Sequence, residues 1–229
     1  MGHSVSRHLR LEIDAYDASI RQFIPGYEPM LNAAVSAVLE VADLRRVVDL
    51  GSGTGALAER LLERDPKVQV ELWDVDSEML DKARQRLARF GERAAYRERS
   101  FFDPLDRVDA AMASLALHHV LEEKEKLALY RKIATGLRPG GALANADVTM
   151  SANEAERRAT FRSWADHMVA HGIAEEQAWR HFDEWSEEDR YFPLEVERSA
   201  LETAGLEAEC RFSDPPSTVL VGRKAAGSG

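Results

Sequence analysis

The chain has 229 residues, 45% of them hydrophobic, so it can bury one substantial core. Its net charge of -10 at pH 7 repels polyanions, which argues against a nucleic-acid partner, since the arginines between residues 84 and 99 are interspersed with acids. It contains no apolar run of membrane-spanning or secretory length, and the single cysteine, Cys210, fits a reducing compartment, so we expect one cytoplasmic domain over 1–229 with no membrane partner.

Two helices are predicted ahead of the first strand. Residues 9–42 carry helical periodicity that is interrupted at Ile24-Pro25-Gly26-Tyr27, which indicates two helices joined by a turn. Such an apolar pair could close over a ligand or form the interface of a homodimer. We therefore treat 9–42 as an N-terminal helical cover.

From residue 46 onward, short apolar runs alternate with helical patterns, which is typical of a parallel sheet covered by helices. The strands are predicted at 46–50, 68–74, 95–99, 108–114 and 142–148, and the helices between them at 56–64, 77–90 and 121–137. The last helix is closed by Arg138-Pro139-Gly140-Gly141, through which no helix can continue. Right-handed crossovers would make this a doubly wound sheet.

After the fifth strand, residues 151–190 are helical again and rich in acids and aromatic side chains, and we predict a helical cap insertion. A further helix over 194–204 leads to two strands, 207–212 and 218–221, which could pair as an antiparallel hairpin. The predicted fold class is therefore α/β, with a doubly wound, mainly parallel sheet of seven strands. Residues 225–229 are expected to form a flexible tail.

The most informative motif is a glycine-rich turn after the first predicted strand, Val47-Val48-Asp49-Leu50-Gly51-Ser52-Gly53-Thr54-Gly55. Glycine suits this turn because the backbone takes positive φ and because a Cβ would block a ligand. The run also satisfies the dinucleotide fingerprint, so a dehydrogenase or a silent nucleotide-binding module stays open. Asp49 favours a different ligand, because its carboxylate would repel a pyrophosphate and attract the ammonium of an amino-acid moiety.

Acids also follow the second and third predicted strands. Asp74 ends an apolar run and is placed to accept hydrogen bonds from both ribose hydroxyls of an adenosine ligand. Asp76 would then begin the next helix as its N-cap. Asp103 precedes Pro104, where it could accept from an exocyclic amine or cap a turn.

Four segments in this order resemble the successive motifs of class I S-adenosylmethionine-dependent methyltransferases: 49–55, 74–80, 109–120 and 137–141. The resemblance covers about residues 9–223 and implies a Rossmann-like methyltransferase fold with S-adenosyl-L-methionine as cofactor. In such enzymes Phe102 and Asp103 would contact adenine, and Ser114 and Leu115 would line the pocket. The full set of implied cofactor contacts is Asp49, Gly51, Ser52, Gly53, Gly55, Asp74, Val75, Met79, Phe102, Asp103, Ser114 and Leu115.

The run from Tyr16 to Tyr27 also resembles a subgroup that includes carboxy-S-adenosylmethionine synthases of tRNA wobble-uridine modification. The arginine that grips the extra carboxylate in those synthases should lie after the cap, where Arg180 and Arg190 are candidates. The resemblance thus leaves two functions, methyl transfer to a small-molecule acceptor and carboxy-cofactor synthesis. An acidic surface and an aromatic cap favour the first.

Methyl transfer from a sulfonium needs a positioned acceptor and, for a hydroxyl or amine acceptor, the removal of one proton. The candidate catalytic residues are His118 and His119 after the fourth predicted strand and Asp147 at the end of the fifth. Ligands of open α/β sheets bind at that edge. These histidines could equally be packing residues.

The aromatic residues of the cap can be interpreted in two ways, one of which is an acceptor pocket. An aromatic stripe at helical spacing could line such a pocket or form the core of the cap itself. As a pocket, it would join the two N-terminal tyrosines in a substrate-binding set: Tyr16, Tyr27, Trp164, His167 and Met168. His167 and His171 also have the spacing of metal ligands, but no third ligand accompanies them, so we expect no metal.

Overall fold

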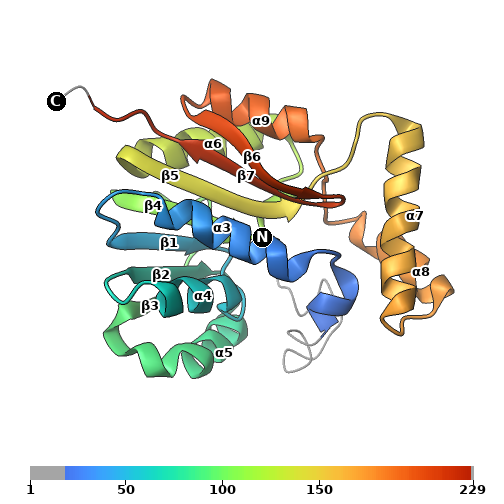
Figure 1. Ribbon diagram of the computed structural model, residues 1–229, viewed down its shortest axis with the longest axis horizontal. Helices are drawn as coiled ribbons and strands as arrows, with labels where there is room; N and C mark the ends of the chain where they lie inside the picture. Colours follow the sequence, from blue (N-terminus) through green and yellow to red (C-terminus); the bar gives the residue numbers. More distant parts are fainter. Residues whose placement is uncertain (1–18, 228–229) are drawn as a thin grey trace.

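A sheet of seven strands forms the centre of the protein (Figure 1). The computed structural model describes residues 19–227. The strands lie in the order β3-β2-β1-β4-β5-β7-β6, and they are β1 (Arg46–Leu50), β2 (Gln69–Asp74), β3 (Ala94–Glu98), β4 (Val108–Ser114), β5 (Leu137–Val148), β6 (Glu207–Asp214) and β7 (Ser217–Arg223). Pairs from β3 to β5 are parallel, whereas β7 runs antiparallel to both β5 and β6. The predicted sheet and its terminal hairpin are confirmed.

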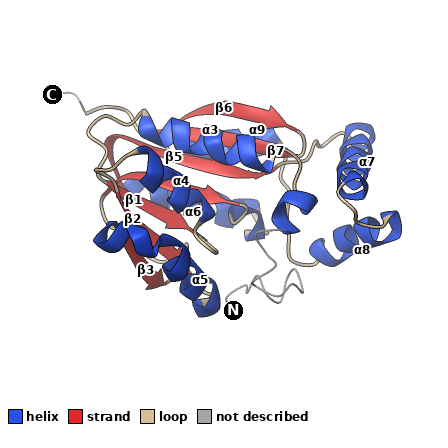
Figure 2. Ribbon diagram, turned by 60° about the horizontal axis from the view of Figure 1, so that its bottom comes forward, coloured by secondary structure: helices blue, strands red, loops and turns tan. Residues whose placement is uncertain are grey.

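Helices cover both faces of the sheet (Figure 2). One face packs against α3 (Tyr27–Leu39), α4 (Ala56–Arg64) and α5 (Ser77–Leu87), and the other against α6 (Glu123–Gly136) and α9 (Leu194–Thr203). The 3-10 helices η1 (Ala88–Arg93) and η2 (Leu117–His119) follow α5 and β4. The cap helices α7 (Glu154–Ala170) and α8 (Glu175–Trp185) stand beyond the carboxyl end of β5 (Figure 1). Within residues 19–227, no helix combines the length and apolarity needed to cross a membrane.

The two central strands explain where this fold can hold a ligand. β1 and β4 are neighbours, and most of their side chains are buried, as expected for parallel strands covered on both faces. The chain continues from β1 to β2 on one side and from β4 to β5 on the other. Such a reversal leaves a crevice outside the carboxyl ends of the strands, where ligands of open α/β sheets bind.

The start of β5 was predicted wrongly. We placed this strand at 142–148 and treated 138–141 as a break, but β5 begins at Leu137. Val108 pairs with Leu137 and Ala110 with Ala142, so residues 138–141 bulge beside a single residue of β4. Proline and glycine are tolerated in a bulge because its extra residues lie outside the hydrogen-bonded ladder. The helical cap, predicted to reach residue 190, ends at Trp185, and the other predicted boundaries within the described residues differ from the observed ones by three residues or fewer.

The N-terminal helices are joined by a turn, as predicted. Residues 19–23 are helical, Gly26 has a φ of 64°, and α3 begins at Tyr27. Residues 9–18 of the predicted helical cover, with Tyr16 among them, lie outside the described residues. The first of the two helices is therefore described only at its end.

The cap is built around an aromatic core. Trp164 is 1% exposed, and its ring centroid lies 5.0 Å from that of Phe182 and 5.7 Å from that of Trp185. Its indole N–H donates to the backbone carbonyl of Phe23, which ties α7 to the helical turn at 19–23. Met168 is fully buried in the same cluster. Of the two readings of this stripe, the structure therefore favours a core.

Candidate functional site

A pocket opens at the carboxyl ends of the parallel strands, in the crevice between β1 and β4. Its wall consists of the glycine-rich turn after β1, residues 74–75 after β2, residues 99–102 after β3, and residues 114–116 with His119 after β4. Tyr27 of α3 also lines it. Segments far apart in the sequence thus meet at one edge of the sheet, as parallel strands require.

Two glycines of the turn are needed for different reasons. Gly51 has a φ of 66°, and a Cβ on it would lie 2.5 Å from the Cβ of Ala116, so the β1 and β4 loops approach each other too closely for any side chain. Gly53 has a φ of 52°, but a Cβ there would meet nothing within 4 Å. Gly51 is therefore needed for the close approach of the β1 and β4 loops, whereas the absence of a side chain at Gly53 leaves space at the wall of the pocket.

Asp49 is the least satisfied polar side chain of the pocket wall. It is 1% exposed, and neither carboxylate oxygen has a hydrogen-bond partner among the described residues. Burial, with a contribution from the charge of Asp74, raises the pKa of Asp49 to about 8. A buried carboxylate is costly unless a donor or a positive charge compensates it. This position therefore fits the ammonium group of a ligand.

Asp74 ties the end of β2 to the glycine-rich turn. Its Oδ2 accepts a hydrogen bond of 2.7 Å from the backbone N–H of Gly53, and its Oδ1 accepts one of 2.9 Å from that of Asp76. Burial raises the pKa of Asp74. Each carboxylate oxygen can accept more than one hydrogen bond, so Asp74 can also receive the two hydroxyls of a ribose. Asp76 accepts from the N–H groups of Glu78 and Met79, which confirms it as the N-cap of α5.

Most of the predicted cofactor contacts line this pocket. They are Asp49, Gly51, Ser52, Gly53, Asp74, Val75, Phe102, Ser114 and Leu115. Phe102 is 44% exposed, with its ring centroid 4.8 Å from that of Phe101, so it offers an aromatic face to a ligand. Further lining residues that we did not predict are Thr54, Ala56, Leu57, Arg99, Ser100, Phe101 and Ala116. A signal was available for most of them, since Thr54, Ala56, Ser100, Phe101 and Ala116 lie beside a predicted contact or in the turn after a predicted strand, whereas Leu57 lies inside a predicted helix and Arg99 ends a predicted strand.

Three predicted cofactor contacts lie outside the lining and need a different interpretation. Gly55 precedes α4, where a Cβ would crowd Leu72 and Leu87 at 3.2 and 3.1 Å. Met79 is 1% exposed and packs in the core. Asp103 accepts a 3.1 Å hydrogen bond from the backbone N–H of Ser100 and so closes a turn. Their observed contacts are with the protein itself, and Asp103 is the turn cap that was its alternative reading.

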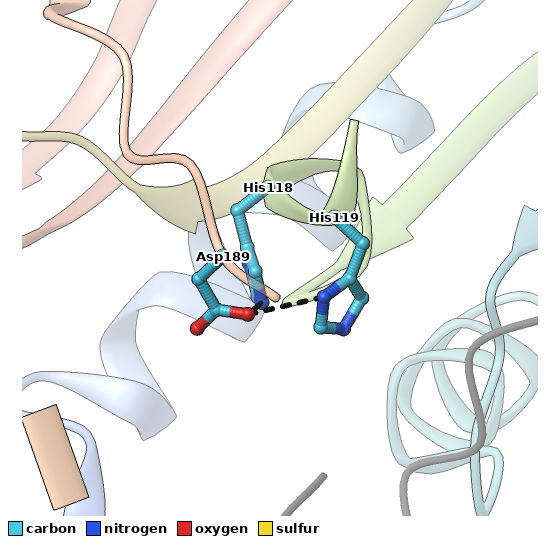
Figure 3. A group of neighbouring side chains, drawn as sticks. All are labelled: His118, His119 and Asp189. Carbon is cyan, nitrogen blue, oxygen red and sulfur yellow. Dashed lines mark ion pairs between the residues drawn. The ribbon is translucent and has the colours of Figure 1, made fainter. Parts of the chain in front are cut away.

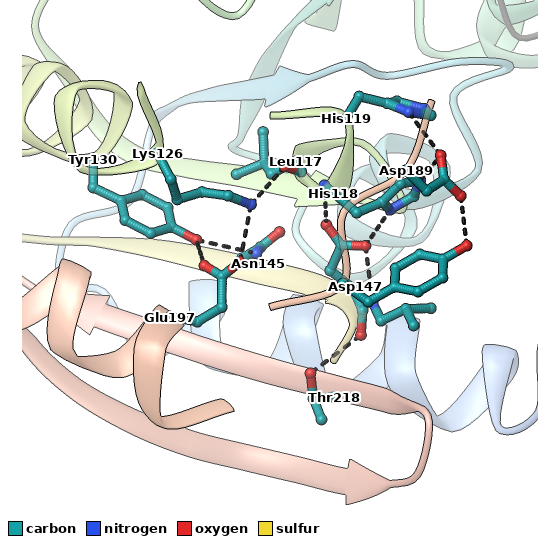
Figure 4. A network of polar contacts seen from close by, with 12 residues as sticks. Leu117, His118, His119, Lys126, Tyr130, Asn145, Asp147, Asp189, Glu197 and Thr218 are labelled. Carbon is teal, nitrogen blue, oxygen red and sulfur yellow. Dashed lines mark hydrogen bonds and ion pairs between the residues drawn. The ribbon is translucent and has the colours of Figure 1, made fainter. Parts of the chain in front are cut away.

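Behind the pocket, His118 and Asp147 form a buried ion pair (Figure 4). His118 Nδ1 lies 2.5 Å from Asp147 Oδ1, and the backbone N–H of His118 donates to Asp147 Oδ2 at 3.0 Å. Burial alone would lower the pKa of His118, but the carboxylates of Asp147 and Asp189 raise it to about 9. Neither member of the pair lines the pocket. In the structure both residues support the η2 turn, and a catalytic role for either of them stays a prediction.

His119 is the candidate base that does line the pocket. Its Nδ1 lies 3.1 Å from Oδ1 of Asp189, which follows α8 (Figure 3). Asp189 Oδ2 accepts a hydrogen bond of 2.5 Å from the hydroxyl of Tyr191. Next to it, the backbone N–H of Arg190 donates to the carbonyl of His118 at 2.8 Å, which joins this segment to η2. Sequence reasoning missed Asp189, because it is one acid in an acidic run and carries no motif.

The predicted substrate-binding residues do not form one pocket. Tyr27 lines the pocket, whereas Trp164 and Met168 lie in the cap core. His167 Nε2 lies 3.2 Å from the backbone carbonyl oxygen of Arg21, away from the pocket wall. Tyr16 lies outside the described residues. Of the predicted substrate-binding residues that the structure describes, Tyr27 is the one that lines the pocket, together with the candidate base His119.

Known proteins similar to this chain share its domain and fold. Residues 47–141 match the family described as a methyltransferase domain. An uncharacterized methyltransferase of Geobacillus kaustophilus is 30% identical over 152 residues, which are 64% of this chain and 65% of that protein. A carboxy-S-adenosyl-L-methionine synthase of Aeromonas salmonicida is 25% identical over 199 residues, or 84% of this chain and 80% of that protein.

A solved structure gives the same result for the fold. The O-methyltransferase family protein of Burkholderia thailandensis superimposes with a TM-score of 0.73 and 24% sequence identity, over 97% of this chain and 63% of that one. The chain spans 64–65% of the length of the two Geobacillus methyltransferases that it matches. The matched domain and the superimposed structure therefore indicate the same fold.

Proposed function

Because residues 47–141 match a methyltransferase domain and the fold is that of an O-methyltransferase family protein, we propose that this chain is a class I methyltransferase that transfers a methyl group from S-adenosylmethionine to a small-molecule acceptor. The observation that carries the proposal is the buried carboxylate of Asp49 in the pocket wall, which has no hydrogen-bond partner among the described residues. An amino-acid ammonium would compensate this charge, whereas the pyrophosphate of a dinucleotide would be repelled by it. The same pocket thus disfavours the dehydrogenase alternative.

The residues of the pocket divide the binding of this cofactor between them. Asp49 would hold the ammonium group, Asp74 the ribose hydroxyls, and Phe102 the adenine ring. When bound, the cofactor supplies an electrophilic methyl group on a sulfonium. What the protein must add is the position of the acceptor and a place for its proton.

His119 is the side chain that we propose for the proton. It lines the pocket, and Asp189 lies 3.1 Å from its Nδ1. A carboxylate at this distance fixes the orientation of an imidazole and stabilises the imidazolium that forms when the ring accepts a proton. This arrangement suits acceptors that lose a proton on methylation, which are hydroxyl and amine compounds.

Carboxy-S-adenosylmethionine synthesis is the second candidate function. The similarity to the Aeromonas salmonicida synthase, which extends over 84% of this chain, supports it. The two arginines that we considered for the extra carboxylate give no such support. Arg180 is an exposed residue of α8 paired with Glu176, and Arg190 is not part of the pocket wall. We therefore favour methyl transfer.

Calorimetric titration of the full chain with S-adenosylmethionine, S-adenosylhomocysteine, carboxy-S-adenosylmethionine and NAD tests the proposal. We expect the first two to bind, and Asp49→Asn to weaken both. Asp81→Asn is a matched control, because this exposed acid of α5 lies outside the pocket wall and is not among the expected cofactor contacts. A preference for the carboxylated ligand would favour the second function, and binding of NAD alone would contradict both. A screen of hydroxyl and amine compounds with labelled methyl donor then identifies the acceptor.

A further inference from the structure

Three side chains of types that can bind a metal ion lie close together beside the pocket (Figure 3). One ring nitrogen each of His118 and His119 and one carboxylate oxygen of Asp189 all lie within 4.8 Å of one another. Asp189 Oδ1 is 3.1 Å from His119 Nδ1 and 3.6 Å from His118 Nε2. Since η2 and the segment after α8 are distant in the sequence, the fold alone brings these atoms together.

The two distances from Asp189 are close to those between the ligands of a small divalent cation, while the three candidate ligand atoms together lie within 4.8 Å of one another. A tetrahedral zinc ion with bonds of about 2.0–2.1 Å holds neighbouring ligand atoms about 3.3 Å apart. The two distances from Asp189 Oδ1 fall on either side of this value. Two imidazoles with one carboxylate also make up a common zinc donor set, which leaves a fourth position open.

The atoms next to the three candidate ligands are arranged as metal sites require. Metal-bound histidines usually donate their other ring N–H to a carboxylate or a carbonyl. Here Nδ1 of His118 lies 2.5 Å from Asp147, and the second oxygen of Asp189 accepts from Tyr191 (Figure 4). Lys126 pairs with Glu197 and donates a hydrogen bond to the carbonyl of Leu117, which holds the η2 turn in place. His118 is thus held in place without a cation, and the η2 turn carries His119 next to it.

The charge of the cluster also favours a cation. The side chains of Asp147 and Asp189 are only 5% and 3% exposed, and both carboxylates lie against imidazole rings. A divalent ion that replaces the proton on Nε2 of His118 would put two positive charges in place of one beside these two carboxylates. The net charge of -10 on the whole chain further attracts cations.

We propose that His118, His119 and Asp189 bind a divalent transition-metal cation of the zinc class, with the open coordination position on the side of the pocket that His119 lines. This site needs neither the cofactor nor an acceptor, so it goes beyond the proposed methyl transfer and does not depend on it. A bound cation would occupy the imidazole nitrogen that otherwise faces Asp189. Metal binding and proton acceptance are therefore alternative states of His119.

Cobalt binding tests the site directly. The full-length protein is treated with a chelator, dialysed and titrated with Co²⁺, while the visible absorption of tetrahedral cobalt is recorded and Zn²⁺ is titrated by calorimetry. We expect one equivalent to bind, and Asp189→Asn and His119→Gln to weaken binding by more than 10-fold. Tyr191→Phe keeps all three ligands and should weaken it by about 10-fold, as the loss of an outer hydrogen bond does.

The second histidine pair provides the matched control. His167 and His171 lie on α7 with ring centroids 4.1 Å apart, so their double alanine variant removes two histidines without touching the proposed site. Its cobalt binding should equal that of the wild type. Absence of a cobalt band, equal binding by Asp189→Asn, or loss of binding in the control overturns the site. Cofactor titrations of the same samples confirm folding and report the methyltransferase proposal separately.

Discussion

Replacing Asp49 by Asn should change the pH dependence of stability in a defined direction. The pKa of this carboxyl is about 8 in the folded protein against an ordinary value of 3.8. Between these values the folded state holds a proton that the unfolded chain has released. The free energy of unfolding therefore decreases as the pH rises from about 4 to about 8. Asn has nearly the same shape and no charge, so it removes this dependence.

The expected magnitude follows from the size of the shift. One pKa unit corresponds to about 1.4 kcal/mol, so ionisation of Asp49 in the unfolded chain alone lowers the free energy of unfolding of the wild type by about 4 kcal/mol at pH 7 relative to pH 4. The stability difference between Asp49→Asn and the wild type should then grow by about 1.4 kcal/mol per pH unit across this range. Urea unfolding at half-unit steps from pH 5 to pH 8 measures it. Parallel curves for the two proteins would refute the reasoning.

The same titration links Asp49 to the cofactor. A ligand ammonium stabilises the ionised carboxylate, so binding below pH 8 should release a proton, and affinity should rise with pH up to about 8. Calorimetry in buffers of different ionisation enthalpy counts that proton. Asp49→Asn should bind more weakly and release none. Equal proton release by both proteins would place the linked group elsewhere.

Three further substitutions test separate parts of the structure. Asp74→Ala should weaken S-adenosylmethionine binding in calorimetry by roughly 1–3 kcal/mol, because two hydrogen bonds to a charged acceptor are lost; unchanged affinity would move the ribose contact elsewhere. Gly51→Ala should lower the melting temperature more than Gly53→Ala, since both positions have positive φ but only the first meets a neighbouring atom at 2.5 Å; equal losses would leave φ alone as the cause. Lys126→Met should cost about 3–5 kcal/mol in urea unfolding by leaving the Glu197 carboxylate uncompensated, and Lys126→Met with Glu197→Leu should recover most of it. A double variant no more stable than the single one would contradict this account.

The sequence determined the sheet well because local signals coincide with the fold. Alternating apolar runs and helical patterns located all seven strands, and the rule that ligands bind at the carboxyl ends of parallel strands located the pocket. Asp49 and Asp74 were found because each acid interrupts or ends an apolar strand. Such residues are conspicuous in a single sequence, since burial of a carboxylate there needs a reason.

Other features depend on contacts that no local pattern encodes. The motif around Met79 identified a segment of the cofactor site but not which side chains of a helix turn toward it. Periodicity placed Trp164 and Met168 on one face of α7, yet what covers that face is decided by residues 19–23 and by α8. The start of β5 at Leu137 depends on a bulge against β4. Asp189 is identified by the structure alone, in which the segment after α8 contacts η2.

The hydrogen bond from Arg190 to the carbonyl of His118 has a consequence for protein engineering. The cap helices α7 and α8 lie between β5 and α9, so they form a unit that could be exchanged for the corresponding segment of a relative. In this protein the segment after α8 places Asp189 3.1 Å from His119, which lines the pocket, and anchors the turn that carries His119. A chimera should therefore exchange residues 151–185 and retain 186–192. A graft that extends to 192 would also remove the contacts of Asp189 with His119 and of Arg190 with His118.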